Sequence, residues 1–451
     1  MRVAVVGAGI AGLAAAHELL LQGATPIVFD ADVRVGGKLR TEAFAGAMVD
    51  TGVDSFLARR PEAVELCREL GLEPKLEPPA ATSAFVFARG ALRRLPAGLV
   101  LGVPTDPVAL ARSGILSGWG VVRAALEPYL PGEPLAADDA LGAVIRRRYG
   151  NEVTERLVNP LLGGINAGDV DSLSIDTVAP QIAAAARRDR SLTRALKDTA
   201  TQATSDSPVF LTLPGGMEGL VDALVASISE RGGEIRRGDP VNAIESGKVT
   251  SRSGAHDVSG VVLAAPAHAT APLLSPHAPG AASTLAAIPY ASVSMVLLAY
   301  DDASMTRPLD ASGFLVPKTE GLLMTAASWA SSKWSHLAKP GRVLLRISAG
   351  RYSDERAMHL DDATLVERIC ADLVTTMGVR GAPTHTSVIR WPRSFPQYPP
   401  GHEARIAGAL ADVAAHAPWI TLSGAALNGV GIPACIGSGR DAARGVLAAN
   451  G

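Results

Sequence analysis

The strongest constraint on the fold is a glycine motif placed directly after a short apolar segment. Residues Val3 to Val6 are all apolar, and the sequence GAGIAG follows at once at positions 7–12. A continuous apolar run is typical of a parallel strand covered on both faces. We expect a helix from Ala11 to Leu21 and a second strand from Thr25 to Phe29. The pattern therefore predicts a βαβ unit that opens a doubly wound α/β domain.

Each glycine of the motif has a physical role in a nucleotide-binding turn. Gly7 permits the tight turn, Gly9 lets the backbone approach a diphosphate, and Gly12 lets the helix pack closely on the strand. The helix N-terminus then offers free N–H groups to the anion. Asp30 ends the second strand, where an acid accepts hydrogen bonds from a ribose. The alternative is a plain strand–helix turn with a capping aspartate, but the strand–turn–helix context favours a nucleotide.

A second glycine-rich segment after Asp30 favours FAD over NAD. Gly36 and Gly37 permit close backbone approach to a diphosphate, and Lys38 adds a positive charge. A solvated basic face is the alternative for Lys38 and its neighbour Arg40. The segment Asp50 to Phe56 then supplies another glycine turn, at Gly52, with small polar groups suited to a ribityl chain and a ring.

Composition limits the remaining classes. A chain of 451 residues is long enough for two or three domains. The net charge of −2 argues against a nucleic-acid partner, which usually requires a basic face. Three cysteines, far apart and odd in number, indicate neither a disulfide framework nor a metal site. With no leader visible at the N-terminus, we expect a cytoplasmic protein.

The segment Val258 to Tyr300 contains no Asp, Glu, Lys or Arg and is long enough to suggest a membrane span. Five prolines interrupt it, and each removes a backbone donor from a helix. We therefore expect a buried strand, a loop and another strand here. After the last strand, at Trp419 to Ser423, we expect a glycine-rich turn and a final helix from Gly439 to Ala449.

Beyond the glycine turns, the chain resembles the porphyrinogen oxidases of the monoderm bacterial type, within the flavin amine oxidase superfamily. Four patches carry the resemblance: Asp54–Arg60; Leu95–Gly98 with Gly102–Thr105; Asn159–Asp169 with Leu173 and Ser174; and Arg390–Pro392 with Pro396–Tyr398, Gly401 and His402. The third patch is the most specific, since general amine oxidases lack it. Residues 424–439 also resemble the superfamily's closing flavin motif.

The resemblance implies a fold of three parts. Residues 1–79, 206–270 and 389–451 would form a discontinuous, doubly wound FAD-binding domain of α/β class. Residues 80–105 and 271–388 would form a mixed α+β substrate-binding domain, and residues 106–205 a helical subdomain.

The resemblance also assigns site residues. The implied contacts to non-covalent FAD are Gly7, Ala8, Gly9, Ile10, Ala11, Gly12, Asp30, Ala31, Gly37, Lys38, Gly52, Val53, Asp54, Ser55, Val241, Trp391, Gly431, Ile432 and Pro433. The candidates for substrate binding are Arg60, Arg93, Arg94 and Ile165. Guanidinium suits a propionate because it donates two parallel hydrogen bonds, although each arginine could equally be a surface charge and Ile165 a core residue. No metal ligand and no catalytic side chain is expected, because a flavin performs the chemistry.

The chain departs from the family pattern at two places, the first at the cofactor ribose and the second at the substrate propionate. The ribose acid is usually Glu, whereas Asp30 is one methylene shorter, and an arginine that some relatives place before Phe85 has no counterpart at Ser83 or Ala84.

The implied activity is oxidation of coproporphyrinogen III to coproporphyrin III by O2, a loss of six electrons that yields three H2O2. The alternatives are oxidation of protoporphyrinogen IX, a different flavin oxidase or desaturase, and a flavin- or porphyrin-binding carrier without turnover. Apolar stretches at Leu95–Val103 and Gly114–Val122 could touch a membrane surface, and each is shorter than the ~20 residues of a span. Whether the chain is a monomer or a homodimer stays open.

Overall fold

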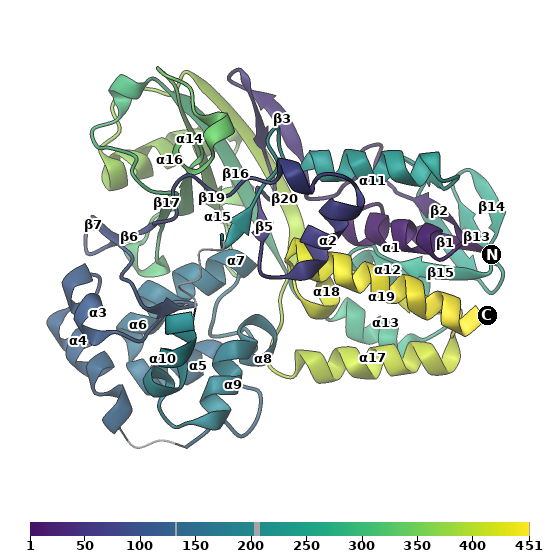
Figure 1. Cartoon of the computed structure of the whole chain (residues 1–451), viewed down its shortest axis with the longest axis horizontal. Coiled ribbons are helices and arrows are strands. Elements are labelled where there is room, and N and C mark those ends of the chain that lie inside the picture. The colour runs from purple at the N-terminus through teal and green to yellow at the C-terminus, as the bar shows by residue number, and fades with distance from the viewer. Residues whose placement is uncertain (131–132, 203–207, 451) are drawn as a thin grey trace.

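The computed structural model describes residues 1–130, 133–202 and 208–450 (Figure 1). Figure 1 shows a sheet flanked by helices on the right, a second sheet at the upper left and a group of helices at the lower left. Both chain termini lie in the right-hand part, so the two ends of the sequence build one region.

Five parallel strands form the first sheet. Their order is β11 (Glu234–Arg236), β2 (Thr25–Phe29), β1 (Arg2–Val6), β15 (Gly260–Leu263) and β21 (Ile420–Leu422). Along β1, Val3 and Val5 join the hydrophobic core on one face, while Ala4 and Val6 join the core on the other. Because both faces are buried from Val3 to Val6, all four of these positions are apolar, and only the exposed first residue, Arg2, is charged. The predicted βαβ opening is confirmed.

Helices cover both faces of this sheet, as a doubly wound fold requires. One layer consists of α1 (Ile10–Leu21), α2 (Pro61–Glu69), α11 (Glu218–Glu230) and α19 (Ile432–Asn450). The other layer consists of α12 (Ala267–Leu274), α13 (Pro279–Ala286) and α17 (His402–His416). A small sheet of β12 (Val241–Glu245), β13 (Lys248–Ser251) and β14 (Gly254–Asp257) belongs to the same region of the molecule.

The second sheet has seven strands and is antiparallel except at one pair. Its order is β20 (His385–Pro396), β16 (Tyr290–Tyr300), β19 (Val343–Ala349), β18 (Met324–Trp329), β17 (Gly313–Leu315), β6 (Phe85–Ala88) and β7 (Ala91–Arg94), with β17 and β6 parallel. One face packs on α16 (Asp362–Met377), whose residues Leu365, Ile369 and Leu373 lie in the same core as Val296 and Leu345. A mixed α+β region therefore stands beside the first sheet, as the sequence predicts.

The third region is helical. Its main elements are α3 (Pro107–Ser113), α4 (Gly118–Ala125), α5 (Leu141–Tyr149), α6 (Asn151–Val153), the wide-turned helix η3 (Thr154–Gly163), α7 (Gly164–Asn166), α8 (Ile175–Val178), α9 (Pro180–Arg188) and α10 (Leu192–Gln202). They enclose their own core, which includes Leu141, Ile145, Leu157 and Ile182. Helices η3 and α7 carry most of the third resemblance patch, and Figure 1 shows α7 below the second sheet.

Two expectations from the sequence are wrong. The segment between β15 and β16 is not a loop but the helices α12 and α13. Pro279 occupies the first position of α13, where its missing N–H is not needed. The last helix begins at Ile432 rather than Gly439, and Gly439 lies inside it because α19 packs closely on α1.

The structure also bears on the expected domain limits. The limit at 270/271 falls inside α12, and the limit at 388/389 falls inside β20. Helices α12 and α13 share a core with the first sheet, since Leu274 and Leu285 pack in the same cluster as Ile27 and Val261. The limit at 205/206 lies outside the described residues.

Candidate active site

A first cavity of about 450 Å³ lies at the carboxyl ends of β1, β2 and β15. Val6, Phe29 and Ala264 mark these strand ends, and the segments 34–40, 391–396 and 424–435 close the cavity from outside. This is the crevice in which doubly wound proteins bind their ligands.

The glycine motif shapes the floor of the first cavity. A side chain at Gly7 (φ 106°) would place a Cβ 2.9 Å from the carbonyl carbon of Ala264, and a Cβ at Gly12 would lie 1.8 Å from the Gly7 carbonyl oxygen. Gly9 differs, because a Cβ there meets nothing within 4 Å. Gly9 caps α1 without a side-chain hydrogen bond, so the first turn of α1 presents backbone donors to the cavity.

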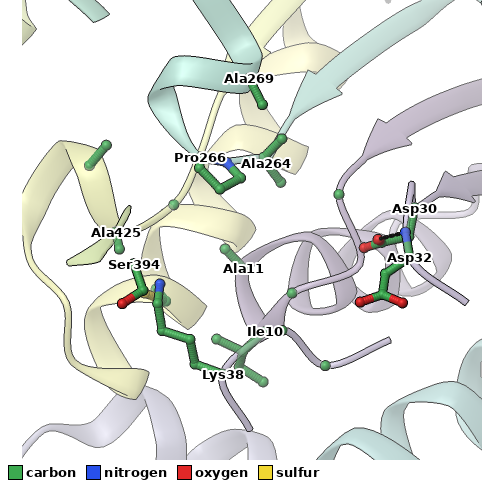
Figure 2. Close-up of a pocket in the computed structure, with 18 of the residues that line it drawn as sticks. Ile10, Ala11, Asp30, Asp32, Lys38, Ala264, Pro266, Ala269, Ser394 and Ala425 are labelled. Atoms are coloured by element: carbon green, nitrogen blue, oxygen red, sulfur yellow. Dashed lines mark hydrogen bonds between the residues drawn. The ribbon is translucent and has the colours of Figure 1, made fainter. Parts of the chain in front are cut away.

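Asp30 is fixed against the glycine motif at one end of the cavity. Its Oδ2 accepts a hydrogen bond from the backbone N–H of Ala8 at 2.6 Å. Its Oδ1 accepts one from the backbone N–H of Asp32 at 2.8 Å (Figure 2). Burial raises the pKa of the Asp30 carboxyl above its ordinary value, and the two backbone hydrogen bonds oppose that rise. The turn and the acid that the sequence predicts are therefore held together as one unit.

Lys38 lies away from Asp30. Figure 2 shows its side chain extending toward Ser394 and Ala425, at the C-terminal closing segment. Its Nζ stands 5.9 Å from the centroid of the Phe395 ring. Burial lowers the pKa of this amine, and the structure gives it no carboxylate within 4.0 Å among the residues it describes. The charge therefore faces the segment that resembles the closing flavin motif, at the end of the cavity where we expect the flavin ring, and not Asp30. Its expected place beside the diphosphate stays a prediction.

Helix α19 brings a second N-terminus to the first cavity. Val430, Ile432 and Cys435 line the wall there. Tyr398 and His402 hold the preceding segment in place, since the Tyr398 hydroxyl donates to the Ala425 carbonyl oxygen at 2.6 Å and His402 Nε2 lies 3.1 Å from the Leu427 carbonyl oxygen. A helix N-terminus stabilises negative charge, so both ends of this cavity suit an anionic ligand.

A second cavity of about 400 Å³ adjoins the first. Four residues line both cavities: Lys38, Val53, Trp391 and Phe395. Its other walls come from segment 52–55, from residues 159–168 of the helical region, and from β16, β18 and β19. All three regions of the molecule therefore meet around this space.

Positive charge predominates in the second cavity. Its ionisable lining residues are four cations, Lys38, Lys333, Arg346 and Arg351, and one carboxylate, Asp54. Asp54 Oδ2 contacts Lys333 Nζ at 2.9 Å, Arg346 Nη1 at 2.5 Å and Trp334 Nε1 at 3.2 Å. The two cations hold the pKa of Asp54 well below its usual range. Apolar side chains, including Pro160, Ile165, Val293 and Met295, line the rest.

The structure brings most of the predicted cofactor residues to these two cavities. Those that line the first cavity are Gly7, Gly9, Ile10, Ala11, Asp30, Ala31, Gly37, Lys38, Val53, Val241, Trp391 and Ile432. Gly52, Asp54 and Ser55 line the second cavity instead. Ala8, Gly12, Gly431 and Pro433 line neither, and Ala8 gives its N–H to Asp30. Their contacts to a cofactor stay predictions.

The three predicted substrate arginines do not reach either cavity. Arg60 precedes α2 and pairs with Glu62 at 3.5 Å. Arg93 Nε donates to the Ala88 carbonyl oxygen at 3.0 Å, and Arg94 pairs with Asp310 at 2.6 Å. These arginines belong to surface and edge-strand contacts. Of the predicted substrate residues, Ile165 alone lines the second cavity.

The sequence analysis missed the cations that do line the second cavity. Lys333, Arg346 and Arg351 all lie in or beside the second sheet, far in sequence from the glycine motifs. One signal was available, because Arg346 is the one charged residue in the largely apolar strand Val343–Ala349. A charge in such a strand is almost always buried with a partner.

Of the two apolar stretches, Leu95–Val103 contributes Val100 and Val103 to the helical core, and Gly114–Val122 contributes Ile115 and Leu116. Trp119, in the second stretch, is exposed. Contact with a membrane surface stays a prediction. No helix in the described part of the chain has the length and hydropathy to cross a membrane, and no cluster of ligands suited to a metal ion occurs among the same residues.

The comparisons with known proteins agree with this geometry. Residues 10–447 match the model of the family described as flavin containing amine oxidoreductase. The coproporphyrinogen III oxidase of Bacillus subtilis (strain 168) is 34% identical over 462 residues, which cover 99% of this chain and 97% of that protein. The coproporphyrinogen III oxidase of Mycobacterium tuberculosis (strain H37Rv) is 33% identical over 452 residues, with the same two coverages.

More distant relatives share the architecture. A chloroplastic and mitochondrial protoporphyrinogen oxidase 2 of Arabidopsis thaliana is 27% identical over 482 residues, covering 98% of this chain and 93% of that protein. The crystal structure of an Exiguobacterium sp. 255-15 protein superposes with a TM-score of 0.88 at 29% identity, over 99% of this chain and 98% of that one. The cyclohexylamine oxidase of Brevibacterium oxydans IH-35A, at 18% identity and a TM-score of 0.70, covers 99% and 98% and shows the fold alone.

The doubly wound sheet, the glycine floor and the two helix N-termini define an FAD-dependent oxidoreductase. The chain belongs to the flavin-containing amine oxidoreductase family and, within it, to the porphyrinogen oxidase group of its bacterial relatives. The cavity fits the cofactor. Gly9 borders the place where a diphosphate would lie with its backbone alone, and Asp30 stands where the ribose would lie.

Proposed function

We propose that this protein oxidises coproporphyrinogen III to coproporphyrin III, with O2 as electron acceptor. The macrocycle loses six electrons and six protons, and three O2 become three H2O2. The observation that best supports this proposal is the second cavity. It adjoins the FAD cavity at the end where we expect the flavin ring, and it combines apolar walls with an excess of cations. An apolar macrocycle with several carboxylates matches this lining.

The size of the site supports a small-molecule substrate. Each cavity lies within the ~300–1,000 Å³ typical of ligand sites. When bound, FAD supplies the two-electron redox chemistry. The protein supplies the walls: Trp391 and Phe395 separate the two cavities, and Trp391 is fixed by the hydrogen bond that its Nε1 donates to the Thr51 carbonyl oxygen at 3.0 Å.

The ionisable side chains of the second cavity suit binding and orientation. Asp54 is its one carboxylate, and Lys333 and Arg346 hold that carboxylate in the ionised form. We therefore assign the cations to charge balance and substrate orientation, and we assign no lining side chain to proton transfer.

The decisive experiment compares initial rates on two substrates. Purified protein reconstituted with FAD should consume O2 and form fluorescent porphyrin from coproporphyrinogen III at a higher kcat/KM than from protoporphyrinogen IX. A higher value for protoporphyrinogen IX would reverse the substrate assignment. Anaerobic bleaching of the flavin by an amine but not by either porphyrinogen would support a different flavin oxidase, and binding of porphyrin without O2 uptake would support a carrier.

We also propose a cytoplasmic location and non-covalent FAD. The three cysteines, Cys67, Cys370 and Cys435, are free, as a reducing compartment favours. Cys435 lines the first cavity, but burial raises the pKa of its thiol to about 11, which keeps it unreactive. Release of the flavin by acid precipitation would support non-covalent binding.

A further inference from the structure

Arg351 lies on a tight turn at the edge of the second cavity. The turn follows β19, and its ends are joined by Arg351 N–H to the Asp354 carbonyl oxygen at 3.2 Å and Asp354 N–H to the Arg351 carbonyl oxygen at 2.9 Å. The N–H of Tyr352 donates to the Ala167 carbonyl oxygen at 2.7 Å. The turn is therefore fixed both to the second sheet and to the helical region, and Arg351 has a defined position.

The carboxylates nearest to Arg351 are already bound to other cations. Arg356 holds Asp354 through two hydrogen bonds, from Nε at 2.8 Å and from Nη2 at 2.9 Å. Lys318 holds Asp169 at 2.9 Å. In the part of the chain that the structure describes, no carboxylate oxygen lies within 4.0 Å of the Arg351 guanidinium, and its buried Nε has no hydrogen-bond partner.

This unpaired state distinguishes Arg351 from its neighbours. Lys333 and Arg346 line the same cavity and share Asp54 as their counter-anion. Burial lowers the pKa of Arg351 despite the attraction of Asp354 and Asp169. A desolvated guanidinium without an anion is costly, and a ligand carboxylate would remove that cost.

The location of Arg351 indicates which ligand supplies the anion. Lys38 lines both cavities and so faces the cofactor, whereas Arg351 lines the second cavity alone. Ile165 and Ala167 stand in the same lining and provide apolar contact beside the charge. An anion at Arg351 would therefore belong to the substrate and not to FAD.

We propose that Arg351 binds a carboxylate of the substrate through two parallel hydrogen bonds and thereby selects substrates that carry a carboxylate at this edge of the cavity. The geometry of guanidinium suits this pairing better than that of an ammonium group. The proposal rests on the proposed function, because it concerns the substrate of that same site.

The test uses the FAD-loaded protein and two porphyrins of one shape. The tetramethyl ester of coproporphyrin III keeps the macrocycle but replaces each carboxylate with a neutral methyl ester, and binding of each porphyrin can be followed by quenching of its fluorescence. Arg351→Met should weaken binding of coproporphyrin III by roughly 10- to 100-fold, as expected for hydrogen bonds between charged groups. The ester should bind wild type and variant equally.

Two further variants control the experiment. Arg351→Lys keeps the charge without the fork, so binding of coproporphyrin III should be intermediate. Arg94→Met removes an arginine that lies outside both cavities, so binding should equal that of wild type. With coproporphyrinogen III as substrate, Arg351→Met should raise KM and leave kcat nearly unchanged, as loss of uniform binding predicts. Melting temperature and flavin content should match wild type.

Each unfavourable outcome has a distinct meaning. If wild type binds neither porphyrin, the proposed function fails. If wild type binds coproporphyrin III and Arg351→Met binds it equally tightly, the assignment of Arg351 fails while the proposed function stands. Should Arg351→Met not fold, Arg351→Gln takes its place. Equal affinity of wild type for the free acid and for the ester also overturns the assignment, and this comparison requires no variant.

Discussion

Arg346 of β19 lies 2.5 Å from Asp54 through Nη1 and donates from Nη2 to the Gly52 carbonyl oxygen at 2.6 Å. Asp54 and Gly52 belong to the glycine turn that follows the cofactor segment, whereas Arg346 belongs to the second sheet. A nearly buried ion pair therefore connects the glycine turn of the FAD-binding region to the second sheet, within the wall of the second cavity.

Asp54→Asn should destabilise the protein by about 3–5 kcal/mol, because it leaves two buried cations without their carboxylate. Thermal unfolding measured with bound FAD would report the loss. Asp310→Asn is the matched control, since it removes the exposed partner of Arg94 and should cost less than about 1 kcal/mol. Equal melting temperatures for the two variants would show that the Asp54 cluster is not a structural link.

Lys38→Met should shift the reduction potential of bound FAD to more negative values, because a cation near the ring end favours the negative charge of reduced flavin. A shift on the order of 30 mV corresponds to about 1.4 kcal/mol for a two-electron couple. Spectroelectrochemical titration measures it. FAD should be retained, since the glycine motif and Asp30 are intact.

The Lys38 effect should also depend on pH. Burial lowers the pKa of Lys38 below its usual 10.5, so more than half of the difference between wild type and Lys38→Met should be lost by pH 10.5. Lys75→Met, at an exposed position outside both cavities, should keep the wild-type potential. Identical potentials for wild type and Lys38→Met at every pH would contradict the placement of this charge.

Gly439→Ala should destabilise the FAD-binding region. The added Cβ would lie 2.2 Å from the Ala11 carbonyl oxygen, so α1 and α19 would have to separate. Overpacking of this kind costs about 1–3 kcal/mol. Gly408→Ala in α17 is the control, because its Cβ meets nothing within 4 Å and should stabilise the helix by roughly 0.5–1 kcal/mol. Opposite signs in the two melting temperatures are expected, and a stabilised Gly439→Ala protein would be inconsistent with the close helix contact.

Asp50 should make stability fall as pH rises from about 4 to 6. Burial raises the pKa of its carboxyl from 3.8 to about 6, so the folded protein holds a proton that the unfolded chain releases. The difference between these two pKa values corresponds to about 3 kcal/mol. Above pH 6 the folded protein is less stable by this full amount than it is below pH 4. Thr41 Oγ1 and the Met217 N–H both donate to one oxygen, Oδ1, at 2.7 and 2.9 Å.

Asp50→Asn keeps that acceptor oxygen and removes the titration. Above pH 6 the variant should therefore melt at a higher temperature than wild type, and the two curves should converge toward pH 4. A constant difference between the two proteins over this range would show that Asp50 does not titrate as described.

The cofactor-binding part of the site could be predicted from local sequence patterns. The glycine motif, the strand before it and Asp30 lie within about 30 residues, and their spacing alone predicts a nucleotide-binding βαβ unit. The position of Gly439 was predicted wrongly, because it depends on a contact between helices that are distant in sequence. A glycine inside a helix resembles a turn residue unless the neighbouring helix is known, and here α1 supplies the reason for the missing side chain.

The residues that line the substrate cavity are set by long-range packing and could not be predicted from local patterns. Arg60, Arg93 and Arg94 follow the glycine turns closely in sequence, yet each has a partner outside the cavities. Arg351 comes 339 residues after Gly12, the last residue of the motif, and the fold brings it to the same place because the second sheet stands beside the first. Nothing near Arg351 in sequence distinguishes it from other arginines of the chain.

The FAD cavity has walls from both ends of the polypeptide, with Gly7 on one side and Cys435 on the other. A nascent chain that still lacks its last twenty residues has the phosphate-binding turn but no closing helix. We therefore expect stable loading of the flavin only once α19 has been made and packed, and a protein without this helix should be purified without colour.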